Sequence, residues 1–203
     1  MQSKDLLGFH IEGHIKIWYP ETGEIAINKR NAIHYENMSI ALAESIADSG
    51  RGFINAMAFG NGGTSVDTTG IITYLTPNST GTNASLYNET YRKVVNDRSL
   101  SNLDPTRNRT EIRHLTGTNY TDVFVTCLLD YGEPNGQEAF DNTSDNDSDF
   151  VFDELGLVSY DPNGAGRLLT HVIFHPVQKS LNRLIQIDYT VRIQSLTGLS
   201  EVA

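Results

Sequence analysis

Cysteine, long apolar runs and basic residues are scarce in this sequence. Because Cys127 is the single cysteine among 203 residues, no disulfide can form within the chain. No run approaches the roughly 18 apolar residues of a membrane span, and the N-terminus lacks the apolar core of a signal peptide. Lys and Arg number 15 against 25 acidic residues, which argues against nucleic acid, since its binding depends on basic side chains. We therefore expect neither a nucleic acid nor a membrane as a partner.

The net charge of -10 comes from one stretch of the chain. Residues 128–163 contain ten acidic residues and no Lys, Arg or His, so the remainder is balanced at 15 acidic and 15 basic residues. We interpret this stretch as an acidic insertion in a neutral scaffold. It is expected to present a charged loop to a basic neighbour.

Alternating apolar and polar residues predict that most of the chain forms β-strands. Residues 9–33 are predicted to form a hairpin, because Pro20 and Gly23 suit the turn at its centre. The cleanest alternation, at residues 184–193, predicts an antiparallel strand with one wet face. Further strands are predicted at residues 53–59, 71–75, 87–95, 121–129 and 168–174.

One helix is predicted from about residue 35 to residue 48, where apolar residues recur at helical spacing. Asn31 and Asn37 are candidate caps for its start, and Gly50 is a candidate stop. The apolar stripe is narrow, so we expect this helix to pack on a sheet and not in a helical bundle.

These elements predict a mainly β fold, either an antiparallel β-sandwich or a small open barrel, with one α-helix packed on it. The length suits a single domain that spans residues 1–203. Two long polar excursions, at about residues 64–90 and 130–150, interrupt the predicted strands. Such segments usually lie at the surface and have a contact role.

Asp145, Asp147 and Asp149 alternate like the first ligands of an EF-hand calcium loop. The pattern then fails, because Phe150 stands where the turn needs glycine and Gly156 stands where a bidentate glutamate belongs. A solvated, self-repelling loop is the better interpretation, and a loose calcium site is the open alternative. We therefore predict no resident metal ion and no other cofactor.

Histidine and cysteine offer no convincing catalytic or metal site. His10 with His14, and His171 with His175, have the spacing that suits zinc on a helix. Both pairs lie on predicted strands, where residues four apart are roughly 13 Å from one another and cannot share a metal. Cys127 lies in an apolar strand that would keep its thiol protonated and shielded. We find no catalytic constellation and expect a protein that is not an enzyme.

The glycine-rich segment 60–63 is the one candidate for a phosphate loop. A P-loop requires a Lys followed by Ser or Thr at fixed spacing, whereas Thr64 and Ser65 follow here without a Lys. The predicted helix also precedes the glycines, where a dinucleotide site would need it to follow. We interpret the segment as a tight exit from a buried strand.

Several short segments form an ordered set. After the predicted helix come Ala-Phe-Gly-Asn-Gly at 58–62, Asn-Glu-Thr-Tyr-Arg at 88–92, Glu-Leu-Gly-Leu at 154–157, a strand that ends near Pro176, and a closing strand. This set, spanning about residues 35–193, resembles virion structural proteins of tailed bacteriophages. The resemblance is to the β-rich proteins of the tail, the collar and the fibre-attachment region, and the order of the motifs carries it.

The resemblance implies a non-enzymatic structural subunit that forms a symmetric ring or attachment layer in the neck, collar or tail. Its partners would be copies of itself, as a homo-oligomer, and neighbouring virion proteins. Its location would be the virion, after assembly in the host cytoplasm. Symmetric assemblies of this kind repeat one modest contact patch around an axis.

We expect the two polar excursions to reach adjacent subunits, at an ordering cost met on assembly. The candidate assembly contacts are acidic residues of the insertion, basic residues that would receive them, and a tryptophan beside the hairpin turn. They are Asp145, Asp147, Asp149, Arg183, Arg192 and Trp18.

The alternative is a carbohydrate-binding host-recognition module of a tail fibre, or a capsid decoration protein. Sugar binding requires exposed aromatic rings, whereas the aromatic residues here fall mostly within predicted strands. They are Phe59, Phe124, Phe150, Phe174 and Tyr189. A calcium-dependent adhesion module is a third possibility.

Overall fold

The computed structural model describes residues 8–134, 151–180 and 182–196, within which the chain forms eleven β-strands and one α-helix. The helix is α1 (Tyr35–Ile46). The strands are β1 (Gly8–Trp18), β2 (Ile25–Ile33), β3 (Ile54–Gly60), β4 (Thr64–Val66), β5 (Ile72–Tyr74), β6 (Glu89–Val94), β7 (Arg109–His114), β8 (Tyr120–Leu129), β9 (Val151–Ser159), β10 (Thr170–Gln178) and β11 (Ile185–Leu196).

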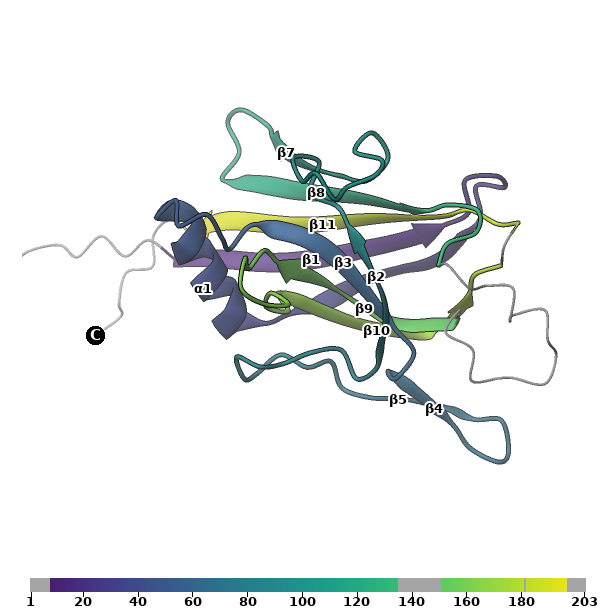
Figure 1. The fold of residues 1–203 in the computed structure, drawn as a ribbon. Coiled ribbons are helices and arrows are strands. Elements are labelled where there is room, and N and C mark those ends of the chain that lie inside the picture. The colour runs from purple at the N-terminus through teal and green to yellow at the C-terminus, as the bar shows by residue number, and fades with distance from the viewer. Residues whose placement is uncertain (1–7, 135–150, 181, 197–203) are drawn as a thin grey trace, which may run out of the picture.

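Nine strands form one antiparallel sheet in the order β6-β3-β9-β10-β2-β1-β11-β8-β7, and this sheet curls into a half-barrel (Figure 1). The other two, β4 and β5, form a separate ribbon. The predicted mainly β fold with one helix is confirmed. Of the two architectures expected, the half-barrel corresponds to the open barrel.

The hairpin predicted at residues 9–33 is formed by β1 and β2. Ile15 and Ile17 point into the core, as their alternation predicts. In the turn, the N–H of Gly23 donates to the carbonyl of Tyr19 at 2.8 Å. Gly23 has a φ of +74°, a conformation that glycine adopts without a steric penalty.

The helix α1 starts at a cap that the sequence does not predict. His34 is the cap, and its Nδ1 accepts a hydrogen bond from the N–H of Asn37 at 3.2 Å. Asn31 and Asn37 are therefore wrong as caps; the side chain of Asn37 instead donates to the carbonyl of Leu168 at 2.9 Å. Gly50 lies beyond the helix in a turn, with a φ of +71°. Within the described residues, no helix is long and apolar enough to cross a membrane.

The concave side of the sheet and α1 enclose one main core. Tyr189, Phe59 and Phe174 are among its largest fully buried side chains. Strand β11 alternates between buried and half-buried residues from Ile187 to Arg192, as predicted, but Gln186 on the predicted wet face is buried. Cys127 lies in the same core without exposed surface, and burial raises the pKa of its thiol to about 12. It is a small core residue, as its sequence context indicates.

The first predicted excursion, residues 64–90, folds back onto the sheet. Leu86 forms a second, small apolar cluster with Ala58, Val158 and Leu168. The β4–β5 ribbon, which precedes Leu86 in the chain, projects from the half-barrel (Figure 1). The excursion is thus anchored at both ends and also at Asn78 and Gly81 in its middle, and its projecting part is the β4–β5 ribbon.

The prediction of one acidic loop over residues 128–163 is wrong in its second half. Residues 151–159 form β9, which pairs with β3 on one side and with β10 on the other. Asp153 and Glu154 are buried within it, with 3% and 0% of their surface exposed. Strand β9 is buried on both faces, because the core covers one face and the excursion covers the other.

Candidate functional site

Asp153 fixes the start of the excursion to β9. One of its carboxylate oxygens accepts the N–H of Gly63 at 2.9 Å, and the other accepts the N–H of Thr64 at 2.8 Å and the Thr64 hydroxyl. Hydrogen bonds to an ionised acceptor are roughly twice as strong as neutral ones. The chain that leaves β3 is therefore held firmly before it enters the β4–β5 ribbon.

Glu154, the next residue, fixes both ends of the excursion. Its Oε1 accepts the N–H of Gly62 at 3.1 Å and the N–H of Asn88 at 2.8 Å. Its Oε2 accepts the N–H of Tyr87 at 2.9 Å and lies 2.9 Å from Nε2 of His171. The side chains of Glu154 and His171 have no exposed surface.

The hydrogen bonds of His171 define its tautomer. Its Nδ1 accepts the N–H of Asn78 at 2.8 Å, so the ring proton is on Nε2 and is donated to Glu154. Burial alone would raise the pKa of Glu154, but the hydrogen bonds from His171 and from backbone N–H groups outweigh it and lower that pKa. A neutral imidazole thus donates to a carboxylate. With no exposed surface, the pair can position the excursion but cannot touch a substrate.

The glycines at 60–63 make this close approach possible. A Cβ on Gly60 would lie 2.4 Å from the carbonyl oxygen of Asn88, and one on Gly63 would lie 3.0 Å from Ile173. The segment is a tight strand exit, as predicted. Its N–H groups at Gly62 and Gly63 also bind anions, and these anions are carboxylates of the chain itself.

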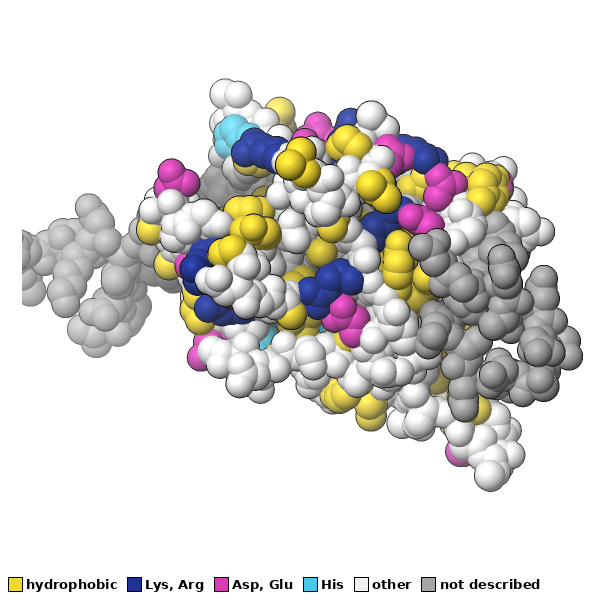
Figure 2. All heavy atoms as spheres, viewed as in Figure 1, with side chains coloured by type: hydrophobic (Ala, Val, Ile, Leu, Met, Phe, Trp, Pro, Cys, Tyr) yellow, Lys and Arg dark blue, Asp and Glu magenta, His cyan; other side chains and the backbone are white. Residues whose placement is uncertain are grey.

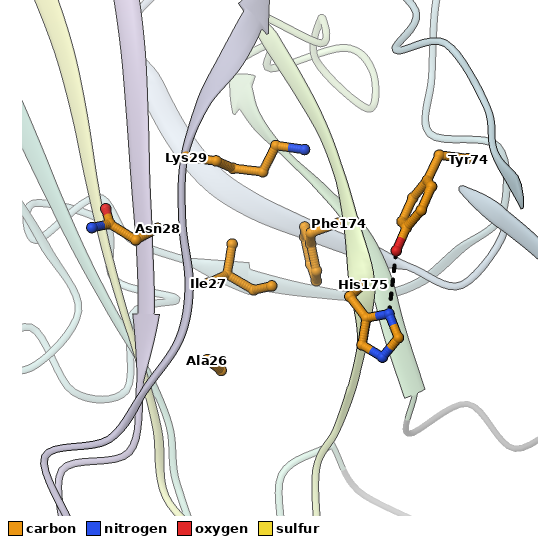
Figure 3. A pocket seen from close by; sticks show the side chains of 7 residues that line it. All are labelled: Ala26, Ile27, Asn28, Lys29, Tyr74, Phe174 and His175. Carbon is orange, nitrogen blue, oxygen red and sulfur yellow. Dashed lines mark hydrogen bonds between the residues drawn. The ribbon is translucent and has the colours of Figure 1, made fainter. Parts of the chain in front are cut away.

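A split between β2 and β10 opens a pocket on the surface of the sheet. The two strands pair only at Ile33 with Thr170 and at Ala32 with His171. Beyond these pairs a pocket of about 290 Å³ opens between them (Figure 3). It is lined by residues 26–29 of β2, by Phe174 and His175 of β10 and by Tyr74 of β5.

Two polar contacts cross this pocket. The ammonium of Lys29 donates to the carbonyl of Ile173 at 2.7 Å, so a side chain bridges the strands where their ladder has ended. The hydroxyl of Tyr74 lies 3.2 Å from Nδ1 of His175 (Figure 3). An ammonium, an imidazole and a phenol therefore face a shallow, open groove. Across the residues that the structure describes, no three His, Cys, Asp or Glu side chains are grouped to hold a metal ion.

Trp18 and Arg183, two predicted assembly contacts, lie where β1 ends and β11 begins. The indole Nε1 of Trp18 donates to Asp188 at 2.9 Å. The guanidinium of Arg183 lies 4.7 Å from the ring centroid of Tyr19. Both side chains are thus held by intramolecular contacts, and a contact with another subunit stays a prediction.

Arg192 lies near the far end of β11, away from Arg183. Its guanidinium binds both carboxylate oxygens of Asp122, at 2.7 and 2.8 Å, and stacks over the ring of Tyr120. The two arginines therefore do not form one basic surface. Asp145, Asp147 and Asp149 lie outside the described residues.

Comparison with known proteins gives no relative for this chain. No protein-family model matches it, and neither the curated proteins nor the solved structures contain a match.

Proposed function

We propose that this protein is a non-enzymatic structural subunit of a tailed-phage virion. It would form a symmetric ring or attachment layer in the neck, collar or tail, through contacts with copies of itself and with neighbouring virion proteins. The observation that carries the proposal is the β4–β5 ribbon with its flanking residues, 64–75, called the arm below. The arm projects from the half-barrel, where it can reach a neighbour (Figure 1).

The arm exposes apolar side chains. Val66 and Ile71 are 62% and 63% exposed, and Tyr74 and Leu75 are 49% and 41% exposed. The register puts Val66 and Tyr74 on one face of the ribbon. Apolar groups that a folded protein leaves in water can mark an interaction surface. These four side chains are available to be buried by an adjacent subunit.

The arm is also held in a defined conformation before any contact is made. At its tip, Oδ1 of Asp67 accepts the N–H of Thr69 at 2.8 Å and the N–H of Ile71 at 3.0 Å. At its base, Asp153 holds Thr64. Because a preorganised segment loses less conformational entropy on binding, such an arm suits a repeated contact in an assembly.

The test is native mass spectrometry of the full chain over a concentration series, with the double substitution Val66→Asp and Ile71→Asp. We expect the wild type to form species larger than a dimer with one defined copy number. The double variant should associate at least tenfold more weakly, because the interface would then have to desolvate two carboxylates.

Ile46→Asp is the matched control, since Ile46 is 86% exposed at the end of α1, outside the arm. It should assemble like the wild type. A wild type that never exceeds a dimer, or an arm variant that assembles normally, contradicts the proposal.

A carbohydrate-binding host-recognition module is the second candidate. It is favoured by the exposed rings of Tyr74 and Tyr87, which are 49% and 44% exposed on the excursion. Flat rings on one surface are what a sugar would stack against. Binding of the full chain to a glycan array, lost in Tyr74→Ala, would replace the structural proposal with this one.

A further inference from the structure

Strand β7 is one of the two edges of the sheet, and its outer side has no ladder partner among the described residues. Arg109, Glu111 and Arg113 alternate along it on the convex face of the sheet. Ile112, between them, is 74% exposed. An edge strand offers unpaired N–H and C=O groups, and natural proteins either block such an edge or pair it. The side chains of β7 determine whether this edge is blocked against pairing or suited to pair with another strand.

A row of alternating charge crosses the sheet and ends at β7. The register places Glu12 of β1 opposite Arg192 of β11, Arg192 opposite Asp122 of β8, and Asp122 opposite Arg113 of β7. Arg192 binds Asp122 through both oxygens, and Arg192 and Arg113 lower the pKa of Asp122. The row therefore runs negative, positive, negative, positive. Within β7 the guanidinium of Arg113 binds Glu111 at 2.9 Å and lies over the ring of Phe124. A strand added outside β7 therefore fits best if it adds a second carboxylate beside Arg113 and a second guanidinium beside Glu111.

We propose that β7 pairs antiparallel with β7 of a second copy of this chain, about a two-fold axis at Ile112. Each Arg113 then lies opposite Glu111 of the other copy, and the two Ile112 side chains lie opposite one another. A two-fold interface repeats each contact twice, so one matched pair of charges becomes two. Opposite charges directly across a strand pair stabilise it, and like charges destabilise it.

Neighbouring registers are less favourable. An axis at Glu111 sets the two Glu111 side chains against each other and each Arg109 against Arg113. An axis at Thr110 pairs each Arg109 with Glu111, but it also sets each Arg113 against Arg107. An axis at Arg113 sets the two Arg113 side chains together. The Ile112 register matches the charges without a like-charged pair, because Arg109 then faces Leu115.

Exposed leucines at both ends of β7 can enlarge the contact. Leu103, before the strand, is 97% exposed, and Leu115, directly after it, is 64% exposed. Specific interfaces bury more than about 1,000 Å² in total, which exceeds what a short ladder supplies alone. Figure 2 shows dark blue, magenta and yellow side chains next to one another along the upper edge, where Figure 1 places β7. Because the two strands are antiparallel, Leu115 at the end of β7 in one copy lies beside the start of β7 in the other copy.

Charge reversal tests the register by sedimentation equilibrium of the full chain. The background for this test is the arm variant with Val66→Asp and Ile71→Asp, in which the arm contact is weakened. That variant should still dimerise, and adding Arg113→Glu or Glu111→Arg alone should weaken the dimer at least tenfold. Adding both substitutions to one chain restores the opposite pairs and should return the affinity to within about threefold of the arm variant. Arg30→Glu, an exposed charge reversal on β2 in the middle of the sheet, is the matched control and should dimerise normally.

Cross-linking gives a second readout that does not depend on charge. Ile112→Cys should form an intermolecular disulfide under mild oxidation, since the two positions face each other; Thr110→Cys should not, because its copies would be roughly 13 Å apart along the strands. Cys127 is buried and does not compete. The proposal is overturned if the arm variant is a monomer, or if neither charge reversal weakens its dimer. It is also overturned if the double reversal fails to restore the dimer, or if Thr110→Cys cross-links more efficiently than Ile112→Cys. None of these results would bear on the arm, which carries the proposed virion role.

Discussion

At the scale of single residues, Glu154 joins three segments that are far apart in the sequence. It accepts N–H groups from Gly62 at the exit of β3 and from Tyr87 and Asn88 at the end of the excursion, and it accepts the ring N–H of His171 on β10. Loss of the carboxylate would leave the fully buried ring N–H of His171 without a partner and would remove the acceptor of three partly buried backbone N–H groups. A buried unsatisfied polar group costs about 1–3 kcal/mol.

Glu154→Gln should lower the free energy of unfolding by about 2–3 kcal/mol at pH 7. The new NH₂ group would face donors at Tyr87 and His171, where Oε2 now accepts. Chemical denaturation measures the change. Glu24→Gln, at an exposed position in the β1–β2 turn, is the control and should change the stability by less than about 0.5 kcal/mol.

The same variant has a defined pH dependence. Folding lowers the pKa of Glu154, so its stabilisation is complete above the unfolded value of about 4.3 and is lost as the pH falls through the lower folded value. The difference between wild type and Glu154→Gln should therefore be constant from pH 5 to 8 and shrink below pH 4. A difference that is absent at pH 7, or that persists unchanged to pH 2, would show that Glu154 does not act as an ionised anchor.

At the scale of elements, β9 is packed so closely that one position tolerates no side chain. A Cβ on Gly156 would lie 2.3 Å from the carbonyl oxygen of Thr170, which is backbone and cannot rotate away. Gly156→Ala should therefore destabilise the fold by about 3 kcal/mol or more. Thermal unfolding of the purified protein measures this.

Gly164→Ala is the matched substitution in the loop before β10. There the nearest atom to an added Cβ is the Asp161 carboxylate, at 3.8 Å. Its effect should stay within about 0.5 kcal/mol. Equal stabilities for the two alanine variants would mean that β9 and β10 are not in this register.

The strands with strong alternation, such as β8 and β11, could be predicted because one of their faces is apolar and buried. Strand β7 could not, because an edge strand carries the polar series Arg109 to His114 and needs little apolar content. Strand β9 could not be predicted either, because Asp153 and Glu154 are typical of an exposed acidic loop. Their hydrogen-bond partners lie far away in the sequence, at residues 62–64 and 87–88 and at His171. Because these partners are distant in the sequence, only the tertiary structure shows that the two carboxylates are buried and hydrogen-bonded.

At the scale of the whole molecule, the acidic stretch separates into parts with different roles. Asp130 pairs with Arg107 at 2.5 Å, and Glu133 pairs with Lys93, while Asp153 and Glu154 lie inside the fold. On the sheet, Glu12, Arg192, Asp122 and Arg113 form a row of alternating charge. We propose that the arm and β7 make the contacts with other chains.

Immunogold electron microscopy of phage particles is the most direct test of the proposal that this protein is built into a virion. Antibodies raised against the full chain would be applied to phage particles purified from cells that produce the protein. We expect gold at one fixed position in the neck, collar or tail of each particle. Unlabelled particles, with the protein recovered only free in the lysate, would contradict it.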